Sequence, residues 1–183
     1  MPGRRRSVPL ATVLSALVFA SGCGGSSEPE PLKPMEPEVP ADLCATVPAS
    51  ARVGLVSNST TVTTGNPTAA CSLRSPANSK RQARAVVTWV QLNDEVSAGE
   101  VFDSQCRSID RTEFKEQAGF EAEGADRACA ARGTLEGADS ATMAAVSDRE
   151  VVTVRLSEPS PATATAFARA QRMLEGVLAS MAG

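Results

Sequence analysis

A short apolar run, Val8 to Ala20, lies between three arginines and a lone cysteine and limits how much of the chain can enter a folded core. The run holds about 13 residues, whereas a helix needs roughly 20 to cross a bilayer. A basic start (Arg4, Arg5 and Arg6), a short apolar stretch and small residues after it are typical of a secretory signal peptide. We therefore predict a signal peptide over residues 1–22. A shortened core helix is the alternative, and the flanking residues disfavour it.

The end of this segment, Ala20-Ser21-Gly22-Cys23, resembles the lipobox of bacterial lipoproteins, although leucine is the usual residue where Ala20 stands. In such proteins the chain is cut before the cysteine, and the cysteine sulfur receives a diacylglyceryl group. Two acyl chains such as palmitate give a stable membrane anchor, at about 0.8 kcal/mol per buried CH₂. We therefore expect Cys23 to be lipidated and the protein to lie on the extracytoplasmic face of the cell membrane. Ordinary cleavage that leaves Cys23 as a free thiol is the alternative.

Residues 23–40 continue from this cysteine as GGSSEPEPLKPMEPEVP, with five prolines and four glutamates. A segment of this composition cannot build a core, so we predict a disordered, semi-extended tether. Residues 41–183 remain, and 143 residues suffice for one domain with a single core.

Composition excludes several classes of function. The chain has no histidine, which removes Ser-His-Asp and Cys-His catalysis and histidine-ligated metals. Without residues 1–22 the formal charge is −6, and there is no basic run, so nucleic-acid binding is disfavoured. With five Phe, one Trp and no Tyr, the core must consist mainly of aliphatic side chains.

Four further cysteines, Cys44, Cys71, Cys106 and Cys129, form an even set in a chain expected to be exported, so disulfides are the default. Three pairings are possible. We favour Cys44–Cys71 and Cys106–Cys129, because each closes a loop of roughly 25 residues, worth about 3.5 kcal/mol in chain entropy. A redox pair or a zinc site is the alternative, but no two of these cysteines have a Cys-x-x-Cys spacing.

The hydrophobic pattern predicts an α+β domain with an antiparallel sheet flanked by helices. Helices are expected at residues 42–56, from Ser97 onward, and from Ser160-Pro161 onward. Strands are expected at residues 60–64, 70–74, 84–92, 128–135, 141–146 and 151–156. Turns are expected at residues 65–67 and 147–150, and the second would make a hairpin of the last two strands.

The predicted strand 84–92 is apolar on both faces, with Val86 and Val90 on one and Val87 and Trp89 on the other. We expect a central strand that is covered on both sides. Trp89 is a weak candidate for stacking against a ligand, but a lone tryptophan in such a strand is more often core.

The predicted middle helix starts with Ser97-Ala98-Gly99-Glu100, which has the pattern of a capping box. Its apolar stripe includes Cys106, which we therefore expect to face the core, where a cysteine on a strand could meet it.

Several short motifs recur together: Leu43-Cys44-Ala45, Ala70-Cys71-Ser72-Leu73, Gly124-Ala125-Asp126-Arg127-Ala128 and Leu174-Glu175-Gly176-Val177-Leu178. Across residues 41–182 the combination resembles a family of actinobacterial lipoproteins of unknown function, with an Asp/Asn-Pro-Cys opening, a Cys-x-Trp strand and a Gly-Asp-x-Ala turn. The resemblance implies a bond between the first two cysteines and a possible Mog1/PsbP-like fold, and it implies no activity. Leu43 replaces the proline and Leu73 the tryptophan, and Cys106 and Cys129 look like an added pair.

No motif identifies a reaction. The acidic stretch from Glu113 to Asp126 lacks the pattern of a calcium loop and the aromatic residues of a sugar cleft, so we read it as solvated surface. The spacing of Thr112 and Lys115 is likewise read as surface charge. We expect no catalytic residue, no metal and no cofactor.

The function expected is a non-catalytic binding domain for an envelope ligand or protein, held to the membrane through Cys23. An accessory interaction protein of a membrane complex is the second hypothesis, and an enzyme without a recognisable site is the third.

Overall fold

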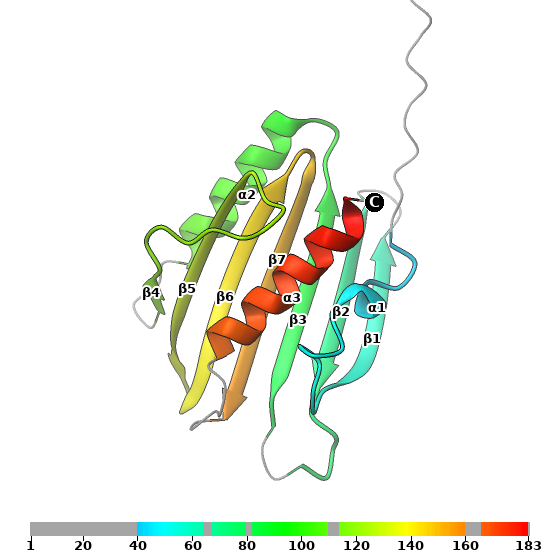
Figure 1. Ribbon diagram of the computed structural model, residues 1–183, viewed down its shortest axis with the longest axis vertical. Helices are drawn as coiled ribbons and strands as arrows, with labels where there is room; N and C mark the ends of the chain where they lie inside the picture. Colours follow the sequence, from blue (N-terminus) through cyan, green and yellow to red (C-terminus); the bar gives the residue numbers. More distant parts are fainter. Residues whose placement is uncertain (1–39, 64–66, 80–81, 110–113, 160–165, 183) are drawn as a thin grey trace, which may run out of the picture. The chain divides into compact units, whose positions relative to one another are not determined.

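Seven strands form one antiparallel sheet, in the order β1-β2-β3-β7-β6-β5-β4, in the computed structural model (Figure 1). The structure describes residues 40–63, 67–79, 82–109, 114–159 and 166–182. The strands are β1 (Val56–Thr63), β2 (Thr68–Arg74), β3 (Arg84–Gln91), β4 (Phe114–Glu116), β5 (Arg127–Leu135), β6 (Ala138–Ser147) and β7 (Glu150–Pro159). The helices are α1 (Leu43–Thr46), α2 (Glu95–Ile109) and α3 (Ala166–Met181). The predicted α+β class is confirmed.

The face of the sheet that carries α1 and α3, here called the α3 face, holds the larger hydrophobic core. Figure 1 shows both helices in front of the sheet, with α3 crossing it and α1 beside β1 and β2. The buried side of α3 consists of Ala166, Ala170, Met173, Leu174, Val177 and Leu178. Residues 117–126 complete the cover next to α3, where Phe120 meets Phe167 edge-on with ring centroids 5.6 Å apart. The α3 face is therefore covered across most of its width.

The opposite face, here called the α2 face, is covered over only part of its width. Helix α2 packs over β5, β6 and β7, where Phe102 and Ile109 join a second, smaller core. Figure 1 shows α2 behind this part of the sheet and no described helix behind β1, β2 or β3. Val86 of β3 is accordingly 40% exposed on this face. The two faces thus differ in how far helices shield them from solvent.

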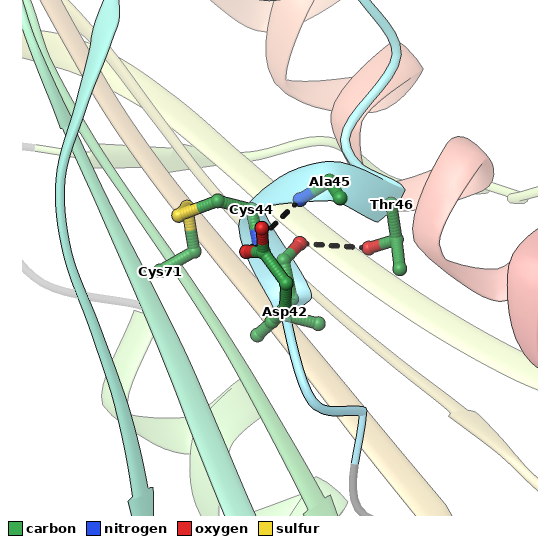
Figure 2. The surroundings of a disulfide bond; sticks show 6 residues. Asp42, Cys44, Ala45, Thr46 and Cys71 are labelled. Carbon is green, nitrogen blue, oxygen red and sulfur yellow. Dashed lines mark hydrogen bonds between the residues drawn. A yellow bond between two sulfur atoms is a disulfide. The ribbon is translucent and has the colours of Figure 1, made fainter.

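A disulfide ties a helix to each face, and both pairings confirm the prediction. Cys44–Cys71, with an S–S distance of 2.06 Å, joins α1 to β2 and is buried on the α3 face (Figure 2). Cys106–Cys129, also at 2.06 Å, joins α2 to β5 and is half-buried on the α2 face. The sequence separations of 27 and 23 residues correspond to about 3.5 kcal/mol of chain entropy each.

The predicted helix over residues 42–56 is confirmed for a single turn, α1, and is wrong for the residues that follow it. Asp42 begins α1 by accepting a 3.0 Å hydrogen bond from the backbone N–H of Cys44 to its Oδ1, and Figure 2 shows the carboxylate over this turn. Val47 then adopts an extended conformation with ψ of 123°. Pro48 explains this, because proline disfavours helical geometry in the residue before it. The chain turns, and the residues expected to end the helix lead into β1.

The prediction for β3 is half right. Register places it centrally, between β2 and β7, and Trp89 is fully buried on the α3 face, as expected of a core residue. The expectation that both of its faces are covered is wrong at Val86. The reason is that α2 packs over the other half of the sheet.

The predicted capping box at Ser97 and Glu100 is also wrong, because α2 begins at Glu95. Asp94 makes the cap: its Oδ1 accepts from the Ser97 N–H at 2.7 Å, and its Oδ2 accepts from the Ser97 hydroxyl at 3.0 Å. These two bonds lower the pKa of Asp94. The expectation that Cys106 meets a cysteine on a strand is confirmed.

The remaining predicted strands are confirmed with small shifts in their bounds, and β6 and β7 form the expected hairpin. Its turn consists of Asp148 and Arg149, with Asp148 at a φ of 51°. The expected turn at Gly65 and Asn66 and the expected helix start at Ser160-Pro161 lie outside the described residues.

Candidate functional site

A groove on the α2 face, here called the arginine groove, is the feature of the described chain that best fits a ligand. Its volume is about 510 Å³, within the range of roughly 300–1,000 Å³ that small-molecule sites occupy. Its charged side chains are Arg84 and Arg155. Its apolar side chains are Val86, Ile109, Phe114 and Leu135, and its hydroxyls belong to Ser108, Ser140, Thr142 and Ser157.

A row of side chains that crosses the sheet explains why this groove exists. Directly opposite residues share a face, so the register aligns Arg84 of β3 with Ser157 of β7, Ser140 of β6 and Gly133 of β5. Phe114 of β4 ends the row. The two serines and the glycine have small side chains or none, so they leave a depression in the surface of the sheet between Arg84 and Phe114. The groove therefore has a cation at one end and an aromatic ring at the other.

The next row places the second arginine beside the first. Arg155 of β7 lies opposite Val86 on one side and Thr142 on the other. Arg155 and Arg84 are diagonal neighbours, a relation that sets Cα atoms about 7–8 Å apart. Arg74 of β2 lies directly opposite Arg84, just beyond the groove. Three arginines therefore occupy one corner of the α2 face.

These three arginines have no acidic partner in the described chain. Arg74, Arg84 and Arg155 are exposed and make no ion pair with a described residue, whereas Arg169 of α3 is paired with Glu158. Like charges directly opposite each other in a sheet are destabilising. The corner is thus a local excess of positive charge on a protein whose net charge is negative.

Ser140, on β6 in the floor of the groove, is polar and nearly fully buried, with 4% of its surface exposed. Its hydroxyl donates to the Ser157 hydroxyl of β7 at 3.0 Å. The two hydroxyls therefore satisfy part of each other's hydrogen-bonding capacity, and the floor is polar between the apolar sides.

A second groove of about 630 Å³, here called the disulfide groove, lies between α2 and β5, next to Cys106–Cys129. Its arginine, Arg127, is already paired with Asp103, and the guanidinium lies 4.7 Å from the ring centroid of Phe102. Because this charge is balanced within the protein, the disulfide groove is less suited than the arginine groove to bind an anion.

Trp89, the weak candidate for ligand contact, lines neither groove. It is fully buried on the α3 face, and its indole N–H has no well-aligned hydrogen-bond partner among the described atoms. Glu150 lies close to it: burial raises the pKa of Glu150, and the nearby indole N–H opposes part of that shift. Trp89 therefore belongs to the core.

Among the residues that the structure describes, no carboxylate lines the arginine groove. In the acidic stretch, Glu116, Glu121, Glu123 and Asp126 are exposed, and Glu113 lies outside the described residues, as does Thr112. Among the residues that the structure describes, no group of three Cys, Asp or Glu side chains could hold a metal ion.

Cys23 and the predicted signal peptide lie outside the described residues, so lipid attachment stays a prediction of the sequence. Within the described ranges, no helix combines the length and the apolar character needed to cross a membrane.

Sequence reasoning missed the groove residues, which come from segments as distant as Arg84 and Ser157. A weak signal was present: Arg84 begins one predicted strand and Arg155 interrupts the apolar run of another, each on the face opposite Val87 and Val154. The sheet order was needed to show that the two arginines are neighbours.

Comparisons with protein-family models, with curated proteins and with solved structures each give no match to this chain. The resemblance to actinobacterial lipoproteins and to the Mog1/PsbP fold therefore stays a prediction.

Proposed function

We propose that this protein is a lipid-anchored, extracytoplasmic binding module without catalytic activity. The single observation that carries the proposal is the arginine groove, which combines charge, apolar surface and ligand-sized volume on the open side of the sheet. Small molecules usually bind in concave sites that are lined by apolar side chains and a few polar groups.

The anchor is supported by the order of the first residues, from the arginines through the apolar run to Cys23. The two disulfides support the extracytoplasmic location, because disulfides persist in oxidising compartments outside the cytoplasm. The proline-rich residues 24–40 would then hold the domain away from the bilayer.

A binding role is better supported than the alternatives. A surface that only docks a membrane complex should be flat and apolar, whereas the α2 face carries a groove whose lining includes two arginines and four hydroxyls. An enzyme would need groups that donate or accept protons near neutral pH, and no carboxylate is found among the described residues that line the groove. Arginine stays protonated in proteins, so it cannot act as the group that donates and accepts protons.

The anchor is tested by cell fractionation of the full chain and its Cys23→Ser variant. We expect the parent in the membrane fraction and the variant in the soluble extracytoplasmic fraction. Ser26→Ala, three residues further along the tether, is the matched control and should stay with the membrane. Equal retention of Cys23→Ser in washed membranes would overturn the anchor.

The binding role is tested separately, by capture from envelope extracts with the Cys23→Ser chain as bait. Small molecules and proteins that co-purify are compared between this bait and a bait that also carries Arg84→Gln and Arg155→Gln. The proposal expects at least one species that depends on the two arginines. Identical recovery from both baits contradicts it.

A further inference from the structure

We propose that the arginine groove binds a small anionic amphiphile, a molecule with one carboxylate or phosphate group and an apolar chain. Arg84 and Arg155 receive the anionic group, and Ile109, Phe114 and Leu135 receive the chain. This inference deepens the proposed binding function and rests on it.

The charge of the site selects an anion. The two groove arginines and Arg74 beside them lie in neighbouring positions without a described acidic partner, on a protein that is otherwise acidic. Guanidinium groups bind carboxylates and phosphates through paired hydrogen bonds, which are stronger than neutral ones. An anion between Arg84 and Arg155 would also remove the repulsion between them.

The apolar side of the site selects a hydrophobic tail. Ile109 ends α2, Phe114 begins β4 and Leu135 ends β5, so three separate elements converge on the part of the groove away from Arg84. Leu135, which lines this part of the groove, is 40% exposed. A bound chain would cover Leu135 and stabilise the complex by about 25 cal/mol per Å² removed from water.

The spacing of the two ends fits one elongated molecule. Arg84 and Phe114 stand at opposite ends of a row that crosses five strands, and strands lie about 4.8 Å apart, so the two Cα positions are separated by roughly 19 Å. The low floor of Ser157, Ser140 and Gly133 lies between them. A volume of about 510 Å³ admits one small amphiphile and no folded partner.

The test is isothermal titration of the complete chain carrying Cys23→Ser, so that no attached lipid competes. Four probes are used: dodecanoate and dodecyl phosphate below their critical micelle concentrations, dodecanol below its solubility limit, and inorganic phosphate. We expect at least one of the first two to bind at least tenfold more tightly than dodecanol and inorganic phosphate. The ratio between dodecanoate and dodecyl phosphate identifies which anionic group the site prefers.

Three arginine variants locate the binding. Arg84→Gln and Arg155→Gln, singly and together, should weaken binding of the preferred amphiphile, at least tenfold in the double variant. Arg132→Gln is the matched control, because this exposed arginine lies on the α3 side of β5, opposite Ala141. It should leave binding unchanged. Circular dichroism of each variant checks that the sheet is intact.

Three results would overturn the inference: no binding of either anionic amphiphile, binding of dodecanol or inorganic phosphate as tight as that of the preferred anionic amphiphile, or unchanged affinity in the double variant. If any of these occurs while envelope capture still yields a species that depends on Arg84 and Arg155, the proposed binding function stands and the assigned ligand class is wrong. If capture fails as well, both fall.

Discussion

The two faces of the sheet are built from the same strands but are covered very differently. On the α3 face, helices α1 and α3 and residues 117–126 bury an apolar core that includes Trp89. On the α2 face the one described helix covers β5 to β7, and three arginines without an ion pair to a described residue lie at the uncovered corner. The difference indicates that the α3 face provides stability and that the open part of the α2 face is available for binding.

The largest expected contrast between the faces concerns two arginines. On the α3 side, Arg169 pairs with the buried Glu158 and donates to the carbonyl oxygens of Ala51, at 2.7 Å, and Val53. Arg169→Met would leave Glu158 buried without a partner, which costs about 3–5 kcal/mol. Arg155→Met on the α2 face should change the free energy of unfolding in urea by less than about 0.5 kcal/mol. Equal losses from the two variants would contradict the division between the faces.

The next contrast uses one glycine in each long helix. A Cβ on Gly176 of α3 would lie 2.2 Å from Cγ of Pro48. Gly176→Ala should therefore push α3 away from the segment that follows α1 and lower the free energy of unfolding by about 1–3 kcal/mol. A Cβ on Gly99 of α2 would meet nothing nearer than a guanidinium nitrogen of Arg127 at 3.9 Å. Gly99→Ala should therefore stabilise the protein by about 0.5–1 kcal/mol through helix propensity. Thermal unfolding of both variants checks the opposite signs.

The two disulfides should differ by less. Both loops have similar lengths, so each bond contributes about 3.5 kcal/mol in chain entropy. Replacing Cys44 and Cys71 by alanine also leaves a void in the buried core, which adds about 1 kcal/mol. Replacing Cys106 and Cys129, which are half-buried, should add little. Urea unfolding measures both losses. A greater loss of unfolding free energy on replacing Cys106 and Cys129 would contradict the claim that the α3 face contributes more to stability.

The smallest effect concerns pH at the edge of the α3 core. Burial raises the pKa of Glu150, so the folded protein disfavours the ionised carboxylate. Glu150 therefore lowers the free energy of unfolding as the pH rises from the ordinary pKa of glutamate through the raised pKa of the folded state. Glu150→Gln should therefore be more stable than the parent at pH 7 and equal to it near pH 3. A constant difference between the two proteins across this range would show that burial does not govern this carboxylate.

Local patterns in the sequence predicted the disulfides and most of the elements, though not β4, because each depends on neighbouring residues or on loop length. Alternation placed Trp89 inside, and equal loop lengths favoured the observed cysteine pairs. Local competition explains two errors: Pro48 ended α1 after one turn, and Asp94 capped α2 ahead of Ser97.

The candidate site could not be predicted in the same way. Arg84 and Arg155 are adjacent because β3 pairs with β7, and no feature of either strand specifies that partner. The exposure of Val86 depends in turn on where α2 packs, which its apolar stripe alone does not determine. Strand order and helix placement are long-range properties, and the site depends on both.

The most direct test of this division follows two adjacent valines by methyl NMR during a titration with dodecanoate. Val86 lies in the arginine groove, and Val87, one residue later in β3, is fully buried on the α3 face. We predict saturable shifts for the methyl groups of Val86, Ile109 and Leu135 and much smaller ones for Val87. Shifts confined to Val87 and the α3 core, or to the disulfide groove, would contradict the account.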